Sequence, residues 1–321
     1  MTQITDRIER ELGVPGLAAL LADRIEPSDL TSLLLEVHRR RVERKRAPDV
    51  LAEYEQNRFV SPAGTSPARF VEWDRLALAL LPAAFDALEL SPVCPIGTCA
   101  AVAAVSQDWA VSTARNTEVV SDVTNVLALE AALRRRALLR SAPRSAQPVH
   151  LAASHRVVRP QLAEAKGLLP HFRLLSLCSA GRDTGSLRFE TDALALHVGF
   201  HLTALRAHLG PSVGLRVALT AWSPGSPLDA AAERVCASLR ERFEGVACAL
   251  DPDRASGRGY YPDLCFKLYA TPPGGAELEL GDGGVVDWTQ KLLANAKERL
   301  LVSGVGSDRV CALAPAGGAL E

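Results

Sequence analysis

The first 60 residues carry apolar and charged positions at the 3.6-residue period of amphipathic helices. The pattern predicts two helices, over residues 3–25 and 29–46. The second, DLTSLLLEVHRRRVERKR, has an apolar first half and a basic second half. Its run HRRRVERKR suits a solvated helix C-terminus, where cations favour the macrodipole; a phosphate-binding patch is the alternative. A polar passage follows, so we predict an N-terminal helical segment over 1–60 and a core over 61–321.

The core mixes helical and strand-like segments. Periodicity predicts helices over 66–83 and in TNVLALEAALRRRALL (which Thr124 or Asn125 can cap), FETDALALHVGFHLTALRAHLG, AAAERVCASLRERFEG and DWTQKLLANAKERL. Composition predicts strands in WAVSTARNTEVVSDV, VHLAASHRVV, VGLRVALTAW, VACALD and LLVSGVGSDRVCALAP, and a hairpin between YYPDLCFKLYA and AELELGDGGV. Because hairpins recur, the pattern favours an α+β fold, with an antiparallel sheet flanked by helices, over a doubly wound parallel sheet.

Composition excludes several classes of protein. The 321 residues are 48% hydrophobic and 23% charged, which is ordinary for a folded globular chain. The 36 basic and 37 acidic side chains leave a net charge of -1, so no global field favours nucleic acid or an anionic membrane. Any nucleic-acid site would therefore be local.

Cysteine usage and hydropathy indicate the compartment. Seven scattered cysteines do not suggest a secreted disulfide framework. The N-terminus MTQITDRIERELGVPG lacks a signal-peptide core, and no later stretch has the apolar length of a membrane span. We therefore expect a cytoplasmic protein without a membrane partner.

Arginines are the main candidates for phosphate binding. Neither GxxxxGK[ST] nor GxGxxG occurs, and GDGG at 281–284 is consistent with a simple tight turn. Arg115, Arg156 and Arg309 stand in or beside apolar, strand-like runs. Each would suit a solvent-facing strand position, but a buried arginine would need an acid or a ligand anion.

Other catalytic patterns are weak. His197 and His201 lie four residues apart, as on one face of a metal-binding helix, but no third ligand is evident. Cys94 and Cys99 lack a second cysteine pair and suit buried apolar positions. GxSxG does not occur. We therefore predict no metal ligands.

The stretch HRVVRPQ, a variable segment, HFRLLSLCSAG and then FETDALAL resembles motif 2 of class II aminoacyl-tRNA synthetases, particularly the histidyl-tRNA synthetase branch. The resemblance implies that Arg156 binds the ATP α-phosphate and that adenine stacks on Phe172. It also matches Arg159, Pro160 and Gln161 to the family's RPQ. The cation and the aromatic would then serve one nucleotide site.

Further segments resemble the same family in the same order, over about residues 60 to 315. The helix 66–83 running into LELSPV resembles motif 1, with Pro92 as its proline, and implies a homodimer. EVVSDVTNVLALEAALRR resembles the segment leading to the family's substrate-binding threonine, here Thr124. GYYPDLCFKLYA resembles the substrate-binding tyrosine strand and places Tyr260 and Tyr261 in the pocket.

The last motifs complete the expected site. GDGGVVDWTQKLL resembles the family's GGRYD turn and retains only Asp287 for substrate binding. GVGSDRV resembles motif 3, which implies that Arg309 binds the ATP γ-phosphate. About a dozen residues follow Arg309, so we expect no anticodon-binding domain.

The sequence also departs from the family pattern. Val158 stands at the motif 2 glutamate position, Lys267 at an acidic position, and Val285 and Val286 at the arginine and tyrosine of the turn. The family's catalytic arginine before the tyrosines has no aligned match, although two arginines lie nearby, Arg254 and Arg258.

Two functions are consistent with this resemblance. The first is ATP-dependent activation of an amino acid or another small carboxylate, with Arg156 and Arg309 as catalytic residues, Mg²⁺ on the phosphates, and tRNA or a carrier as a possible acceptor. The second is a noncatalytic subunit that senses a ligand, like the regulatory subunit of ATP phosphoribosyltransferase. Loss of polar groups favours the second, and retention of both arginines and Phe172 favours the first.

Overall fold

The strand-like runs assemble into one large sheet. The computed structural model describes residues 2–161, 169–223 and 225–314, and within them eight strands pair in the order β1-β4-β5-β10-β9-β8-β6-β7. The pairs β1–β4 and β6–β7 are parallel and the others antiparallel. The strands are β1 (Phe85–Ala87), β4 (Val149–Val158), β5 (His171–Arg182), β6 (Gly214–Ala221), β7 (Val246–Leu250), β8 (Leu264–Thr271), β9 (Leu278–Val286) and β10 (Glu298–Gly306).

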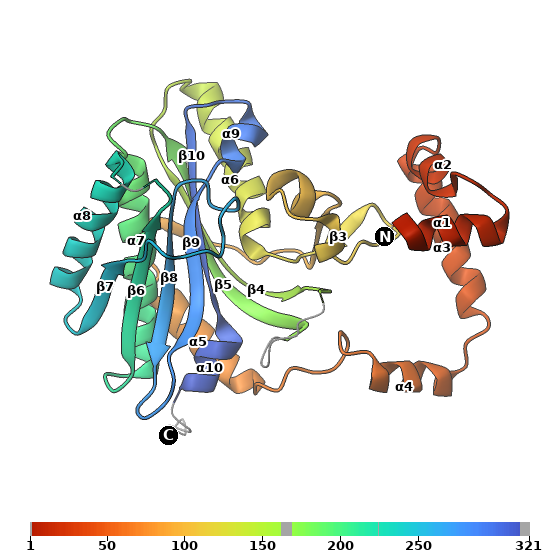
Figure 1. Ribbon diagram of the computed structural model, residues 1–321, viewed down its shortest axis with the longest axis horizontal. Helices are drawn as coiled ribbons and strands as arrows, with labels where there is room; N and C mark the ends of the chain where they lie inside the picture. The colour runs from red at the N-terminus through yellow and green to blue at the C-terminus, as the bar shows by residue number, and fades with distance from the viewer. Residues whose placement is uncertain (1, 162–168, 224, 315–321) are drawn as a thin grey trace.

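Helices cover both faces of this sheet (Figure 1). The face that we call the pocket face packs against α6 (Val123–Ser141), η1 (Thr98–Val102) and α9 (Trp288–Leu293). The opposite face, called the back face, packs against α5 (Pro67–Ala79), α7 (Arg188–Leu209), α8 (Pro227–Arg242) and α10 (Ser307–Leu313). The predicted α+β architecture, an antiparallel sheet flanked by helices, is confirmed.

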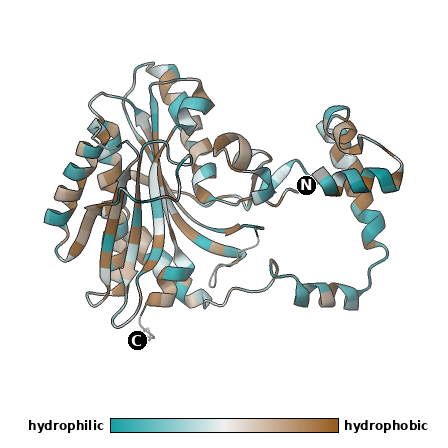
Figure 2. Cartoon of the chain, viewed as in Figure 1, coloured by the Kyte–Doolittle hydropathy of each residue, from teal (hydrophilic) through white to brown (hydrophobic). Residues whose placement is uncertain are grey.

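Each face has its own apolar core. The back-face core includes Trp73 and Leu205, and the pocket-face core includes Leu127 and Val302. Brown, hydrophobic positions recur along the strands in Figure 2. Alternation of side chains along each strand supplies both cores at once, because successive residues point to opposite faces.

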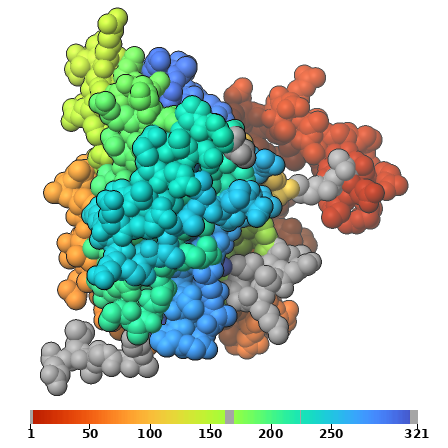
Figure 3. Space-filling view, turned by 60° about the vertical axis from the view of Figure 1, so that its left-hand side comes forward, coloured from red at the N-terminus to blue at the C-terminus, as the bar shows by residue number. Residues whose placement is uncertain are grey.

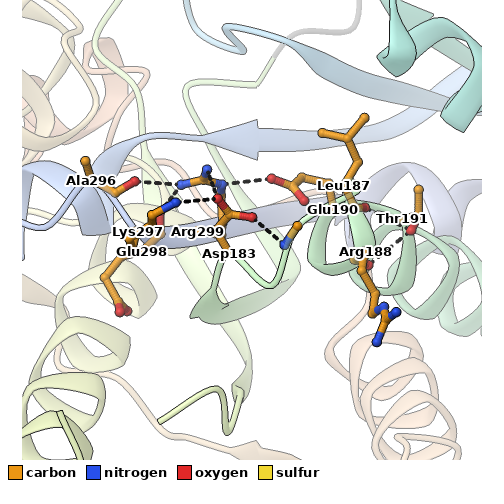
Figure 4. A network of polar contacts seen from close by, with 10 residues as sticks. Asp183, Leu187, Arg188, Glu190, Thr191, Ala296, Lys297, Glu298 and Arg299 are labelled. Atoms are coloured by element: carbon orange, nitrogen blue, oxygen red, sulfur yellow. Dashed lines mark hydrogen bonds and ion pairs between the residues drawn. The ribbon is translucent and has the colours of Figure 1, made fainter. Parts of the chain in front are cut away.

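Ion pairs hold the end of the sheet where β5 finishes and β10 begins. Arg299 donates to Glu190 at 2.9 Å and to Asp183 at 3.0 Å, as Figure 4 shows, and so joins β10 to α7 and to the end of β5. Arg135 of α6 and Glu298 are fully buried and pair at 2.8 Å. Removing one partner of such a buried pair typically costs several kcal/mol.

The N-terminal segment lies to one side of the sheet (Figures 1 and 3). It contains α1 (Thr2–Leu12), α2 (Leu17–Asp23), α3 (Pro27–Val42) and α4 (Ala47–Gln56), and no residue described in them is buried. The single helix expected over 3–25 is wrong, because GVPG breaks it and Gly13 and Gly16 adopt positive φ. The helix α4 was not expected from its polar sequence.

Four other local predictions need correction. GDGG is the interior of β9 rather than a turn. The helix expected over DWTQKLLANAKERL ends at Leu293, and Glu298 already belongs to β10. Arg309 lies on the helix α10 rather than on a strand. Asp122, rather than Thr124 or Asn125, caps α6.

The expected strand WAVSTARNTEVVSDV is mostly irregular. It begins at the last residue of the short η2 (Gln107–Trp109) and contains β3 (Thr117–Val119), which pairs with β2 (Val93–Pro95). Arg115 lies in the turn before β3 and lines a hollow against α3 together with His38 and Val42. Among the described helices, none combines the length and apolarity required to cross a bilayer.

Candidate ligand site

A pocket of about 610 Å³ opens on the pocket face over β5, β9 and β10. Glycines of β9 allow close packing in and beside its floor. A Cβ on Gly281 would overlap the carbonyl oxygen of Gly304, and a Cβ on Gly284 would overlap the ring of Tyr261. The glycine-rich sequence of β9 therefore lets strands and an aromatic ring approach closely.

Phe172 and Arg309 line one end of the pocket, and Arg159 lies between Phe172 and the N-terminus of α6. The Arg159 guanidinium lies 5.1 Å from the centroid of the Phe172 ring, a cation–π distance. Arg159 also donates to the Ser121 carbonyl at 3.0 Å and to Asp122 Oδ2 at 3.1 Å. These partners hold the partly exposed Arg159 guanidinium beside the face of the Phe172 ring.

Arg309 reaches the same end from the first turn of α10. Its Nη1 donates to the Glu279 carbonyl at 2.7 Å, which holds the side chain against β9. The turn from β10 into α10 thus places Arg309 where β9 and β10 border the pocket.

Two carboxylates stand beside Arg309. Glu279 pairs with Lys267 at 2.7 Å. Asp308 accepts a hydrogen bond from the backbone N–H of Arg173 at 2.7 Å through Oδ2, whereas its buried Oδ1 has no partner among the described residues. An unpartnered buried carboxylate oxygen is costly, so this atom is available to a ligand or a cation.

The other end of the pocket begins at the N-terminus of α6. Asp122 Oδ1 accepts from the backbone N–H of Thr124 at 2.9 Å and from its hydroxyl at 2.7 Å. This N-cap fixes the carboxylate at the rim of the pocket. The buried Asn125 Oδ1, in the same lining, has no partner within the described part of the chain.

Tyr260 and Tyr261 line the pocket next to the N-terminus of α6. Their rings meet edge to face at 4.9 Å, and Tyr260 packs on Trp288 at 5.5 Å. Burial raises the pKa of both phenols well above the usual value, with nearby carboxylates adding to the shift. Both phenols are therefore neutral hydrogen-bonding groups at physiological pH.

Asp282 and Arg254 form an ion pair beside Tyr261, with 3.2 Å between Oδ2 and Nη2. Burial raises the pKa of Asp282, and Arg254 opposes this. The Asp282 side chain is nevertheless 41% exposed and lines the pocket. Arg254 is buried, and its Nη1 has no partner among the described residues.

Arg156 does not line this pocket. It pairs across the hairpin with Arg173, while Val157 pairs with Phe172, so Arg156 and Phe172 point to opposite faces of the sheet. On the back face Arg156 donates to His171 Nδ1 at 3.0 Å and lies 5.2 Å from the centroid of the Phe70 ring. Arg156, Phe172 and Arg309 therefore do not converge; the hairpin cation at the pocket is Arg159.

Asp287 also lies outside the pocket lining. It is the N-cap residue of α9 and pairs with Lys291 at 2.9 Å. Val285 and Val286 are buried in the two apolar cores. The other sequence candidates, Thr124 and the tyrosine pair, do line the pocket together with Phe172 and Arg309.

Several polar lining residues were missed from the sequence, among them Asp122, Asn125, Glu279, Asp282 and Asp308. An aspartate just before a helical pattern is an N-cap signal, and it would have identified Asp122. Asp282 was hidden in the GDGG that suggested a turn. The part of the motif 2-like hairpin between its strands, residues 162–168, lies outside the described residues.

His197 and His201 of α7 are buried and hydrogen-bond to serines of the sheet. His197 hydrogen-bonds to Ser179 at 2.8 Å and to Ser303 at 2.9 Å, and His201 hydrogen-bonds to Ser303 at 2.8 Å. Burial lowers the pKa of both, that of His201 to about 3. In the described part of the chain, no three His, Cys, Asp or Glu side chains are grouped to hold a metal ion.

A segment of the N-terminal region touches the hairpin. The Arg58 guanidinium donates to the carbonyls of Gln161 at 2.6 Å and Pro160 at 3.2 Å. His171 Nε2 hydrogen-bonds to the Ser61 carbonyl at 2.7 Å. The chain around residue 60 is therefore tied to the place where the hairpin leaves β4.

Comparison with known proteins shows similarity in structure. No protein-family model and no curated protein matches the sequence. An ATP phosphoribosyltransferase regulatory subunit/histidyl-tRNA synthetase from Bacillus halodurans superimposes with a TM-score of 0.56 and 16% identity, covering 80% of this chain and 83% of that one. Histidyl-tRNA synthetase from S. aureus gives 0.56 and 14%, covering 79% and 69%. A histidine–tRNA ligase subunit from Alicyclobacillus acidocaldarius gives 0.55 and 13%, covering 79% and 94%.

These similarities define the class of fold. The chain has a class II aminoacyl-tRNA synthetase-like core, as its motifs suggested. The neighbours include synthetases and a regulatory subunit, so the fold alone does not distinguish catalysis from regulation.

Proposed function

We propose that the pocket binds a small amino acid together with ATP and joins them as an aminoacyl-adenylate, releasing pyrophosphate. One observation carries the proposal: Arg159, Phe172 and Arg309 share a single pocket with the polar group formed by Asp122, Thr124 and Tyr260.

The amino acid would occupy the end of the pocket at α6. Its ammonium group would meet Asp122, whose position is fixed by the N-cap hydrogen bonds and by Arg159. The neutral phenols of Tyr260 and Tyr261 would line its side chain. A carboxylate directed toward Arg159 would then lie between the two ends of the pocket.

ATP would occupy the other end. Phe172 offers an aromatic face for adenine. Arg159 takes the α-phosphate role that the motif resemblance gave to Arg156, and Arg309 takes the γ-phosphate. The guanidinium suits both positions because its planar, permanently charged fork binds phosphate oxygens in pairs.

The reaction needs little covalent help from the protein. A carboxylate oxygen of the amino acid attacks the α-phosphorus, and the bond from that phosphorus to the pyrophosphate oxygen breaks. The carboxylate is already ionised, so no general base is required. Positioning by Asp122 and charge stabilisation by the two arginines supply the catalysis.

Mg²⁺ fits the phosphate end of this site. The free Oδ1 of Asp308 and the carboxylate of Glu279 are oxygen donors beside Arg309, and Mg²⁺ is commonly held by one or two carboxylates plus substrate phosphates. When bound, the ion would neutralise phosphate charge.

ATP–pyrophosphate exchange, screened over the amino acids, tests the proposal. We expect exchange with one or a few amino acids, abolished by Arg159→Ala and retained by Arg156→Ala, the matched control from the back face. Absence of exchange with every amino acid, together with no ATP-induced thermal shift, would exclude the enzyme.

A second function is ligand sensing without catalysis. The described pocket lining carries four carboxylates, from Asp122, Glu279, Asp282 and Asp308, against two guanidiniums. That balance favours a ligand with an ammonium group over a free triphosphate. Calorimetric amino-acid binding that is unchanged by ATP and Mg²⁺ would support this function.

We propose two kinds of partner, a second copy of the chain and an acceptor molecule. A homodimer would use α5, whose Val71 side chain is 66% exposed. The predicted acceptor, tRNA or a carrier, would gain little from the basic run at residues 38–46. Arg39, Arg40, Lys45 and Arg46 in this run already pair with acids of the N-terminal segment. This supports the interpretation of the run as a solvated helix end.

A further inference from the structure

Two buried cysteines meet at the edge of the sheet farthest from β1. Cys236 lies on α8 and Cys248 on β7, and their sulfur atoms are 2.8 Å apart. Their exposed fractions are 0% and 4%. The two residues belong to the back-face core and come from neighbouring elements, α8 and the strand that it covers.

Other cysteines have different surroundings. The sulfurs of Cys94, Cys99 and Cys311 contact oxygen atoms at 3.6 to 3.9 Å. Among the described residues, Cys236 and Cys248 are the pair recorded in sulfur–sulfur contact. A disulfide bond is about 2.05 Å long, so a small closure of α8 onto β7 would form one.

We propose that Cys236 and Cys248 form a reversible disulfide when the protein meets a small-molecule disulfide such as oxidised glutathione. The site goes beyond the proposed adenylation activity and is independent of it. It assigns a redox modification to a pair of thiols that the sequence suggested only as reduced cysteines of a cytoplasmic protein.

The two thiols have unequal reactivity. A hydrogen bond from the Cys248 thiol lowers the pKa of Cys236, and the nearby Arg240 guanidinium acts in the same direction. The same hydrogen bond and burial raise the pKa of Cys248. Cys236 is therefore the attacking thiolate and Cys248 the resolving thiol.

The exchange balances in two steps. The Cys236 thiolate attacks one sulfur of oxidised glutathione, forms a mixed disulfide and expels a glutathione thiolate. The Cys248 thiol then loses its proton to that thiolate or to solvent and attacks the Cys236 sulfur, which releases the second glutathione. Two protein thiols are oxidised and one external disulfide is reduced to two thiols.

Access requires a local opening, and the edge of the sheet is suited to one. The strand β7 has five residues and pairs only with β6 in the described sheet. Such edge elements open at lower free energy than central strands. No described pocket-lining residue comes from α8 or β7, so the disulfide should leave ligand binding unchanged.

The test uses the full chain incubated with oxidised glutathione, then alkylated in denaturant and digested with trypsin. We expect a linked pair of the peptides VCASLR (235–240) and FEGVACALDPDR (243–254), lost on reduction. The other five of the seven cysteines should remain alkylated. Closure of this short loop should raise the melting temperature by about 3–6 °C, reversibly.

Variants control the assignment. Cys248→Ser should remove the linked peptides and leave glutathione attached to Cys236, whereas Cys311→Ala, at an equally buried cysteine, should retain the link. The wild-type measurement stands even if a variant fails to fold. Full alkylation of all seven cysteines after oxidant treatment, or two separate glutathione adducts without a linked peptide, would overturn the proposal.

Discussion

The hairpin of β4 and β5 presents arginines to both faces of the sheet, and the two faces use them differently. On the pocket face, Arg159 lies over Phe172 and pairs with Asp122, and its side chain remains 39% exposed. On the back face, Arg156 and Arg173 lie over the Phe70 ring at 5.2 and 5.6 Å. Side chains of the same chemistry thus line a pocket on one face and pack against a helix on the other.

The back face fastens α5 to the hairpin. Asp74 of α5 accepts hydrogen bonds from Ser154 of β4 and from the guanidinium of Arg173 of β5. The Asp74 side chain is only 15% exposed, so this pair is better shielded than Arg159 and Asp122. The comparison teaches that back-face changes should appear in stability and pocket-face changes in ligand affinity.

Acid should act on the back face first and should have the largest effect. His197 and His201 have lowered pKa values in the folded state, so the unfolded chain binds protons first as the pH falls below about 6.5. Their stabilising effect is complete above that pH. Between pH 7 and 5 we expect each to cost about 2 kcal/mol of unfolding free energy. Urea denaturation at several pH values measures it.

The variant His201→Gln keeps a nitrogen near Ser303 but does not titrate. It should reduce the loss of unfolding free energy between pH 7 and 5 by about 2 kcal/mol. An unchanged slope in the variant would show that other groups cause the acid sensitivity.

The next effect concerns Asp74. Asp74→Asn keeps the shape but leaves Arg173 without its counter-charge, so we expect a loss of about 2 kcal/mol in unfolding free energy. The exposed ion pair of Asp86 with Arg134 provides the control. Asp86→Asn should cost less than about 0.5 kcal/mol. Equal losses in the two variants would contradict a special role for the back-face pair.

On the pocket face, Arg159→Ala should weaken ATP binding by about 30-fold. The change removes charge-assisted hydrogen bonds of about 2 kcal/mol but leaves the core intact. Calorimetric titration measures the affinity, and the unfolding free energy serves as the check on folding. Unchanged affinity would remove Arg159 from the proposed nucleotide site.

The smallest effect should follow from Arg156→Ala. Losing the hydrogen bond to His171 and the contact with Phe70 should cost about 1 kcal/mol of stability. ATP affinity should stay within about twofold of the wild type, because affinity differences follow lost contacts to the ligand. A large loss of affinity with unchanged stability would reverse the assignment of the two faces.

The sequence predicted the architecture better than the site. The order of the synthetase-like motifs was enough to indicate the sheet and its helices. Each motif spans a helix or strand together with the segments next to it in the chain. Their order was not enough for Arg156, because a shift of one residue in the pairing of β4 with β5 exchanges the faces, and the segment joining these strands does not reveal the register.

Other site features depend on contacts between distant segments. Asp282 of β9 meets Arg254 of the connection between β7 and β8, and GDGG enters a strand because Tyr261 and Ser303 pack where side chains would otherwise stand. Cys236 and Cys248 meet only after α8 has folded onto β7. Local propensity carries no information about such encounters.

The contact of Arg58 with the carbonyls of Pro160 and Gln161 links the N-terminal segment to the core across the boundary near residue 60. Arg58 and Ser61 stand on either side of that boundary, and both touch the hairpin that bears Phe172. Truncating the chain at residue 61 would therefore do more than remove four exposed helices. It would also remove contacts that hold the hairpin bearing Phe172 in place. A chain shortened to the smallest folding unit need not retain ligand binding at the pocket.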